Sequence, residues 1–115
     1  MSGSPAGEGT SCIGVGQQIL SSCANERNDI EAYYSIASTT PASPQEIQQS
    51  IAALRGANLP TMPCCSSSAT FVNAECQCDP TLAAILPSVG VAVTGLKSQL
   101  AILADACGNF VMTNC

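Results

Sequence analysis

Residues 64 to 78 read CCSSSATFVNAECQC and combine two cysteine motifs with helical spacing. The stretch holds two adjacent cysteines, then ten other residues, and then a CxC motif. The thiol and apolar side chains of one face recur at steps of four, three and four, at Cys65, Ala69, Val72 and Cys76. Such steps bring side chains onto one side of a helix. The stretch therefore predicts a helix that carries thiols at both ends of one face.

The number of cysteines indicates the cellular compartment. The chain has 115 residues and eight cysteines, and those outside the opening stretch are Cys12, Cys23, Cys107 and Cys115. An even number of thiols at this density is typical of a disulfide framework formed in an oxidising compartment. The N-terminus has neither a basic segment nor an apolar run, so we expect a signal peptide to be absent from this chain. We therefore expect a secreted, extracellular protein in which every cysteine is disulfide-bonded.

Helical spacing also marks the first half of the chain. Val15 and Ile19 lie between Cys12 and Cys23 at steps of three and four, which predicts a helix with two thiols on its inner face. Residues 28 to 37 form a second, weaker helical pattern, because Tyr and Ile are only fair helix formers.

A third helix is predicted around residues 44 to 56 by its start signal. Ser43 suits an N-cap, Pro44 suits the first turn, and Glu46 is the return partner of a capping box. Gly56 suits the end of this helix.

The C-terminal third predicts two further helices. Asp79 and Pro80 form another N-cap and first turn, and the buried side chains expected to follow are Leu82, Ile85 and Leu86. A longer helix is expected to bury a regular stripe that consists of Val89, Val93, Leu96, Leu100, Leu103 and Cys107. The tail after Gly108 is predicted to be extended. Since no segment shows sustained alternation of apolar and polar residues, the predicted fold class is all-α.

Composition predicts one domain with an irregular interior. Residues 12 to 115 form the expected domain, and residues 1 to 11, rich in Gly and Ser, form an expected flexible tail. Hydrophobic residues make up 46% of the chain, but aromatic residues only 3%, and Trp is absent. A core of Ala, Val, Ile and Leu leaves more irregular space than one filled with aromatic rings. We therefore expect a core that stays partly hollow.

Charge and hydropathy exclude two classes of function. The formal net charge of −5 repels nucleic-acid phosphates and anionic membrane surfaces. No apolar run is long enough to predict a transmembrane segment. We expect neither nucleic-acid binding nor a membrane span.

The cysteine order C, C, CC, CxC, C, C resembles the eight-cysteine motif of the prolamin superfamily. That superfamily includes the plant non-specific lipid-transfer proteins, the 2S albumins and the cereal amylase/protease inhibitors, and the resemblance covers the chain from Cys12 to Cys115. It implies a disulfide-stapled bundle of about five helices around an apolar cavity. The forty residues between Cys23 and Cys64 exceed the usual family spacing, which predicts that the helix around residues 44 to 56 is an insertion.

The resemblance also implies a disulfide pairing, whereas spacing alone leaves 105 pairings open. The implied pairs are Cys23 with Cys64 and Cys65 with Cys107, while Cys12 and Cys115 divide Cys76 and Cys78 between them. A polar Gln77 favours Cys12–Cys78 and Cys76–Cys115, since a polar residue at this position usually points outward in that arrangement.

The function implied by the resemblance is the binding and transfer of a fatty acid, a phospholipid or another apolar small molecule. The candidate lining residues are Val15, Ile19, Ile51, Leu54, Val72, Leu82, Leu86, Val93, Leu96, Leu100 and Val111. The alternative is that these side chains pack only against one another. Arg55, Lys97 and Tyr34 are candidates for the cavity mouth, and the alternative for each is a solvated surface position.

Two other functions share this framework. An amylase or protease inhibitor would present an exposed loop, for which residues 39 to 43 or 59 to 63 are candidates. A structural module of an extracellular assembly would instead use its apolar faces to bind a protein partner.

The remaining classes have little support in the sequence. Hydrophobins have two adjacent cysteine pairs and a β-rich body, whereas this chain has one such pair. A zinc site is disfavoured because the chain lacks a CxxC motif and has no His. Without His there is no usual general base, so we expect no enzymatic activity and no cofactor.

Overall fold

The computed structural model describes residues 8–113, and over this range it is all-helical, with no strand. This confirms the predicted fold class. The helices are α1 (Glu8–Ser22), α2 (Ala24–Glu31), α3 (Pro44–Gly56), α4 (Met62–Asn73), α5 (Pro80–Ile85) and α6 (Val93–Cys107), with two short 3-10 turns, η2 (Cys76–Cys78) and η3 (Leu86–Val89).

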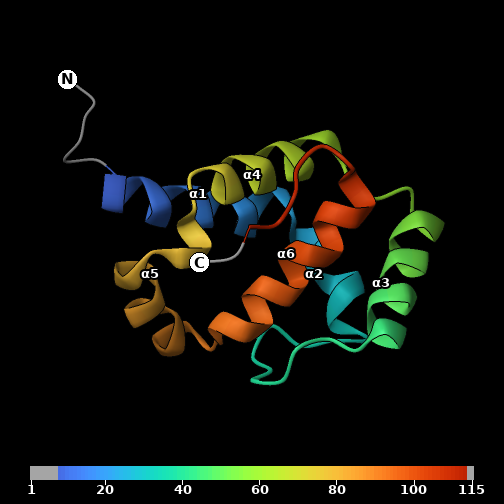
Figure 1. Ribbon diagram of the computed structural model, residues 1–115. Helices are drawn as coiled ribbons and strands as arrows, with labels where there is room; N and C mark the ends of the chain where they lie inside the picture. Colours follow the sequence, from blue (N-terminus) through green and yellow to red (C-terminus); the bar gives the residue numbers. More distant parts are fainter. Residues whose placement is uncertain (1–7, 114–115) are drawn as a thin grey trace.

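Helix α6 is the centre of the arrangement (Figure 1). It contacts α4 and α3, α4 packs along α1, and α2 packs on α3. The segment α5–η3 lies at the opposite end of the molecule from α3 (Figure 1). Fully buried apolar side chains from four helices meet in the core, namely Ile30, Leu54, Phe71, Leu100 and Ile102.

Helix α3 confirms the predicted extra helix between the second cysteine and the adjacent pair. The Oγ atom of Ser43 accepts a hydrogen bond from the backbone N–H of Glu46 at 3.1 Å, and Glu46 Oε1 accepts one from the N–H of Ser43 at 2.8 Å. Ile51 and Leu54 are buried against the rest of the protein. The residues of this capping box lie within one helical turn, so the start of the helix could be predicted from the sequence alone.

Helix α2 corrects the prediction for residues 28 to 37, because it starts at Ala24 and ends at Glu31. The backbone of Ile36 forms hydrogen bonds outside α2. Its carbonyl oxygen accepts a hydrogen bond from the N–H of Ala92 at 3.1 Å. The N–H of Ile36 donates to Glu31 Oε2 at 2.7 Å. Both groups are thus bonded outside a helical pattern, and the chain must leave the helix before Ile36.

Three smaller corrections concern two helix ends and the burial of two side chains. Cys76 lies in η2 and not in α4, because Glu75 takes a left-handed conformation with φ 57°. Val89 lies before α6, in η3, and Gly90 separates the two with φ 76°. Val89 is 65% exposed and Ile85 is 40% exposed, so neither belongs to a buried stripe.

The N-terminal boundary also differs from the prediction. Helix α1 begins at Glu8, within the segment expected to be a tail, while residues 1–7 lie outside the described range. Adding one turn to an existing helix needs no new nucleation, which favours the extension of α1 on the N-terminal side of Cys12. After α6, residues 108 to 113 contain no helix, as predicted.

Disulfides join helices that are distant in sequence. Cys23–Cys64 links the end of α1 to α4, and Cys65–Cys107 links α4 to the end of α6, and these two pairs confirm the implied ones. The third pair is Cys12–Cys76, which corrects the favoured Cys12–Cys78 and rules out Cys76–Cys115. Cys78 is also disulfide-bonded, and Cys115 lies outside the described residues.

Gln77 explains why the pairing rule based on its polarity is wrong. Its side chain is buried instead of pointing outward. The Nε2 atom donates a hydrogen bond to Thr113 Oγ1 at 3.0 Å, so burial does not leave this donor unpaired. A polar residue can therefore occupy the inward position when the C-terminal tail supplies an acceptor.

Within residues 8–113, no single helix is long and apolar enough to cross a membrane. The segments Pro80–Val89 and Val93–Cys107 reach the required length and apolar content only when taken together, and they are bent by 101°.

Candidate ligand-binding pocket

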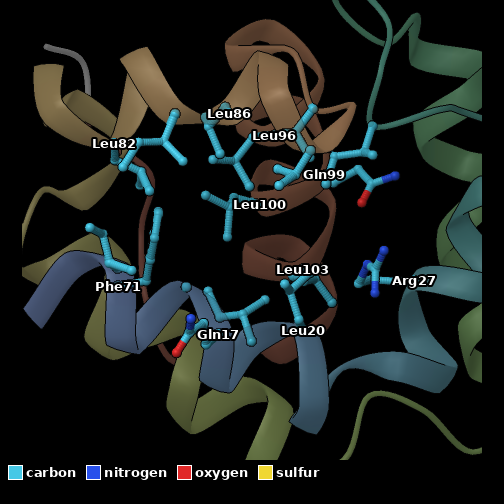
Figure 2. A pocket seen from close by; sticks show the side chains of 17 residues that line it. Gln17, Leu20, Arg27, Phe71, Leu82, Leu86, Leu96, Gln99, Leu100 and Leu103 are labelled. Carbon is cyan, nitrogen blue, oxygen red and sulfur yellow. The ribbon is translucent and has the colours of Figure 1, made fainter. Parts of the chain in front are cut away.

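An apolar pocket of about 210 Å³ opens beside α6. Figure 2 shows the side chains that line it, which come mainly from α1, α6 and the segment α5–η3. Phe71 from α4, Arg27 from α2 and Ile36 from the loop after α2 complete the wall. Because exposed side chains such as Val89 border this pocket, the expectation of a hollow interior stays a prediction.

The floor of the pocket is built by regular helical spacing. Leu96, Leu100 and Leu103 of α6 follow one another at steps of four and three and all line the pocket. Leu100 and Phe71 are almost fully buried. The floor is therefore part of the same core that stabilises the fold.

Two features leave this space open. Gly16 of α1 lies beside Phe71, and a Cβ atom added to Gly16 would meet Phe71 Cε2 at an ordinary contact distance of 3.7 Å, so this position adds no side chain to the pocket. The bonds Cys12–Cys76 and Cys65–Cys107 tie α1 to η2 and α4 to α6 at fixed positions. Cross-linked helices can keep a cavity that freely packing helices tend to close.

The mouth of the pocket is apolar as well. Leu20 from α1 and Ile85 and Val89 from α5–η3 line the pocket and are also exposed to solvent. Large exposed hydrophobic side chains that gather at one opening indicate a contact site more strongly than scattered ones do.

Three polar side chains, Gln17, Arg27 and Gln99, line the pocket. Gln99 is buried, and its Nε2 atom donates to Glu31 Oε2 at 2.7 Å and to the carbonyl oxygen of Tyr34 at 3.2 Å. Figure 2 shows Arg27 and Gln99 on the side of the pocket away from Leu82 and Phe71. Arg27 and Gln99 thus stand at one end of the pocket, whereas Gln17 lies on the same side as Phe71 (Figure 2).

Five of the predicted apolar lining residues lie in this pocket: Ile19, Leu82, Leu86, Leu96 and Leu100. The other six do not line it: Val15, Ile51, Leu54, Val72, Val93 and Val111. Ile51 and Leu54 are buried in α3, Val72 is buried in α4, and Val111 is 77% exposed in the C-terminal tail. Helical spacing predicts that a side chain is buried, but it does not predict which side chains border a cavity.

The predicted polar mouth residues are also placed elsewhere. Tyr34 is buried, and its hydroxyl donates to the carbonyl oxygen of Thr40 at 2.8 Å, which holds the loop after α2. Arg55 is exposed on α3, and Lys97 is half-buried on α6 outside the pocket lining. The cation of the pocket is Arg27, which was missed because the second helix was predicted to start one residue after it.

Nine apolar or small lining residues were also not predicted. Those apolar or small residues are Ile13, Gly16, Leu20, Ile36, Phe71, Ile85, Val89, Val91 and Leu103. Ile13, Gly16 and Leu20 recur at steps of three and four in α1, beside the face that holds Cys12 and Ile19. A second apolar face on the first helix was therefore the signal available in the sequence.

No protein-family model, curated protein or solved structure was found to match this chain.

Proposed function

We propose that this protein binds a fatty acid or another apolar small molecule in the pocket beside α6. The observation that carries the proposal is the composition of the lining: three polar side chains stand among residues that are otherwise apolar or Gly. Ligand sites are typically concave and apolar, with a few placed polar groups.

The energy available from such a site is sufficient for binding. Each methylene group moved from water into an apolar pocket contributes about 0.8 kcal/mol. Ten buried methylenes would contribute about 8 kcal/mol, from which association costs of several kcal/mol are subtracted. In this mode of binding, the affinity rises with the number of methylene groups that the pocket buries.

The cysteine order and the helical fold support a further part of the proposal, a relationship to the lipid-transfer branch of the prolamin superfamily. The disulfides support secretion into an oxidising extracellular compartment, where such bonds persist. Transfer of the bound lipid between surfaces would use the exposed apolar mouth formed by Leu20, Ile85 and Val89.

A binding role is favoured over a catalytic one because of the titratable groups at the pocket. Arg27 is the only charged residue among the lining side chains. A guanidinium stays protonated and serves poorly as a general base. We propose that the protein is not an enzyme.

The test is native mass spectrometry of the protein mixed with dodecanol. We expect a complex with one bound dodecanol, and we expect Leu96→Trp, which fills the pocket, to reduce the bound fraction at least about tenfold. Ile47→Trp is the matched control, since Ile47 is also half-buried but lies on α3 outside the pocket.

Two results would contradict the proposal. One is the absence of a dodecanol complex with the natural protein. The other is an equal loss of binding in Leu96→Trp and Ile47→Trp. Either result would leave the inhibitor function or the structural function as the explanation of the fold.

A further inference from the structure

Arg27 has a buried polar atom that no other group satisfies. Its Nε atom has no hydrogen-bond partner among the described residues. Buried donors without a partner are uncommon in folded proteins, and each one calls for an explanation. Since Arg27 also lines the pocket, a ligand in the pocket could supply the missing acceptor.

Among the described residues that line the pocket, Arg27 is the one with a charged side chain. Glu31, one turn further along α2, does not line the pocket, and its Oε2 atom accepts hydrogen bonds from Gln99 and from the N–H of Ile36. Gln17 is the third polar lining residue and is uncharged. A ligand group near Arg27 therefore meets a guanidinium whose N–H groups can donate in a planar fork.

The two ends of the pocket differ in the ligand chemistry that they suit. Leu82 and Phe71 lie away from Arg27 in Figure 2, with Leu86, Leu96 and Leu100 between them. A molecule that fills this space presents a hydrocarbon part to the leucines and one end to the guanidinium. Neutral hydrocarbon would leave the Nε donor unpaired, at a cost in free energy.

We propose that the ligand is a single-chain amphiphile with an anionic head group, such as a carboxylate, that binds to Arg27. This inference depends on the proposed function, and it adds the charge of the ligand and the residue that selects it. The volume of about 210 Å³ is below the range of pockets that hold drug-sized molecules, which favours one hydrocarbon chain over a two-chain phospholipid.

The experiment compares three probes that share a twelve-carbon chain: dodecanoate, dodecanol and dodecyltrimethylammonium. Their affinities are measured by isothermal titration calorimetry at neutral pH for the natural protein and for Arg27→Gln, Arg27→Lys and Arg55→Gln. Arg55→Gln is the matched control, because it removes the same charge from an exposed position on α3.

The natural protein is expected to prefer dodecanoate over dodecyltrimethylammonium by at least about tenfold. Arg27→Gln should reduce the ratio of dodecanoate affinity to dodecanol affinity about tenfold, while Arg27→Lys should restore part of that ratio. Arg55→Gln should leave the ratio unchanged.

Each remaining outcome overturns a defined claim. If dodecanol binds but dodecanoate shows no preference over the cationic probe, the head-group inference is wrong and the proposed function stands. The same conclusion follows if Arg27→Gln and Arg55→Gln lower the ratio equally. If none of the three probes binds, both the head-group inference and the proposed function are wrong. If a variant at Arg27 fails to fold, the comparison of the three probes on the natural protein still tests the head-group inference.

Discussion

The carbonyl group of Ile36 packs directly on Gly95 of α6. A Cβ atom at Gly95 would lie 2.0 Å from the carbonyl oxygen of Ile36, which is far inside van der Waals contact. The same oxygen accepts a hydrogen bond from the N–H of Ala92. The loop after α2 is thereby held against the start of α6, and Ile36 becomes part of the pocket wall.

Gly95→Ala is expected to destabilise the protein by about 3 kcal/mol, because the obstructing atom is backbone and cannot move aside as a side chain can. Thermal or urea unfolding monitored by circular dichroism would measure the change. Gly14→Ala is the matched control in α1, where a Cβ meets nothing within 4 Å. Since Ala is the better helix former, this control should gain up to about 1 kcal/mol. Equal effects of the two substitutions would contradict the packing described for Ile36.

Ser43→Ala is expected to cost about 1 kcal/mol, because it removes the side chain that caps α3. Ser43→Asp should retain most of the stability, since Asp is an equally good N-cap. Both variants would be compared with the natural protein by thermal unfolding. Equal stability of Ser43→Ala and the natural protein would mean that α3 does not depend on its capping box.

The pairing of Cys12 with Cys76 predicts the thiol content of two double variants. Replacing Cys12 and Cys76 together by Ser should leave no free thiol and should cost about 4 kcal/mol, the chain-entropy value for a loop of this length. Replacing Cys12 and Cys78 together by Ser should deprive Cys76 of its partner, so free thiol or rearranged bonds should appear. Titration of thiols in denaturant distinguishes the variants. Free thiol in the first variant would show that the pairing is different.

Val89→Trp is expected to report ligand binding by fluorescence, since the chain has no other Trp and Val89 is an exposed residue of the pocket lining. Addition of dodecanol should shift its emission to shorter wavelength as the mouth loses water. Val111→Trp is the matched control, because Val111 is also a largely exposed valine but lies outside the pocket. A shift of the same size at both positions would indicate non-specific binding.

Features that depend on residues close in sequence could be predicted well. The capping box at Ser43 and the Asp79–Pro80 start signal act within one turn of helix, so the starts of α3 and α5 were expected where they occur. The all-helical class followed in the same way from spacing of three and four. The confirmed pairs Cys23–Cys64 and Cys65–Cys107 came from a family resemblance and not from the spacing.

Features that depend on contacts between distant segments could not be predicted. The end of α2 is set by Gly95 and Ala92, which lie more than fifty residues away from it in the chain. The pairing of Cys12 with Cys76 accompanies the burial of Gln77, whose hydrogen bond to Thr113 no local pattern indicates.

Propensity, capping and the spacing of residues act over one or two turns, so the helices, their apolar faces and the presence of a disulfide framework could be predicted from the chain alone. Where the helices leave space, and which side chains border it, depends on how they pack in three dimensions. Arg27 reaches the pocket because α2 starts directly after Cys23 and its last residue, Glu31, is hydrogen-bonded to Gln99 of α6. The size and polarity of a cavity depend on how several helices are held relative to one another.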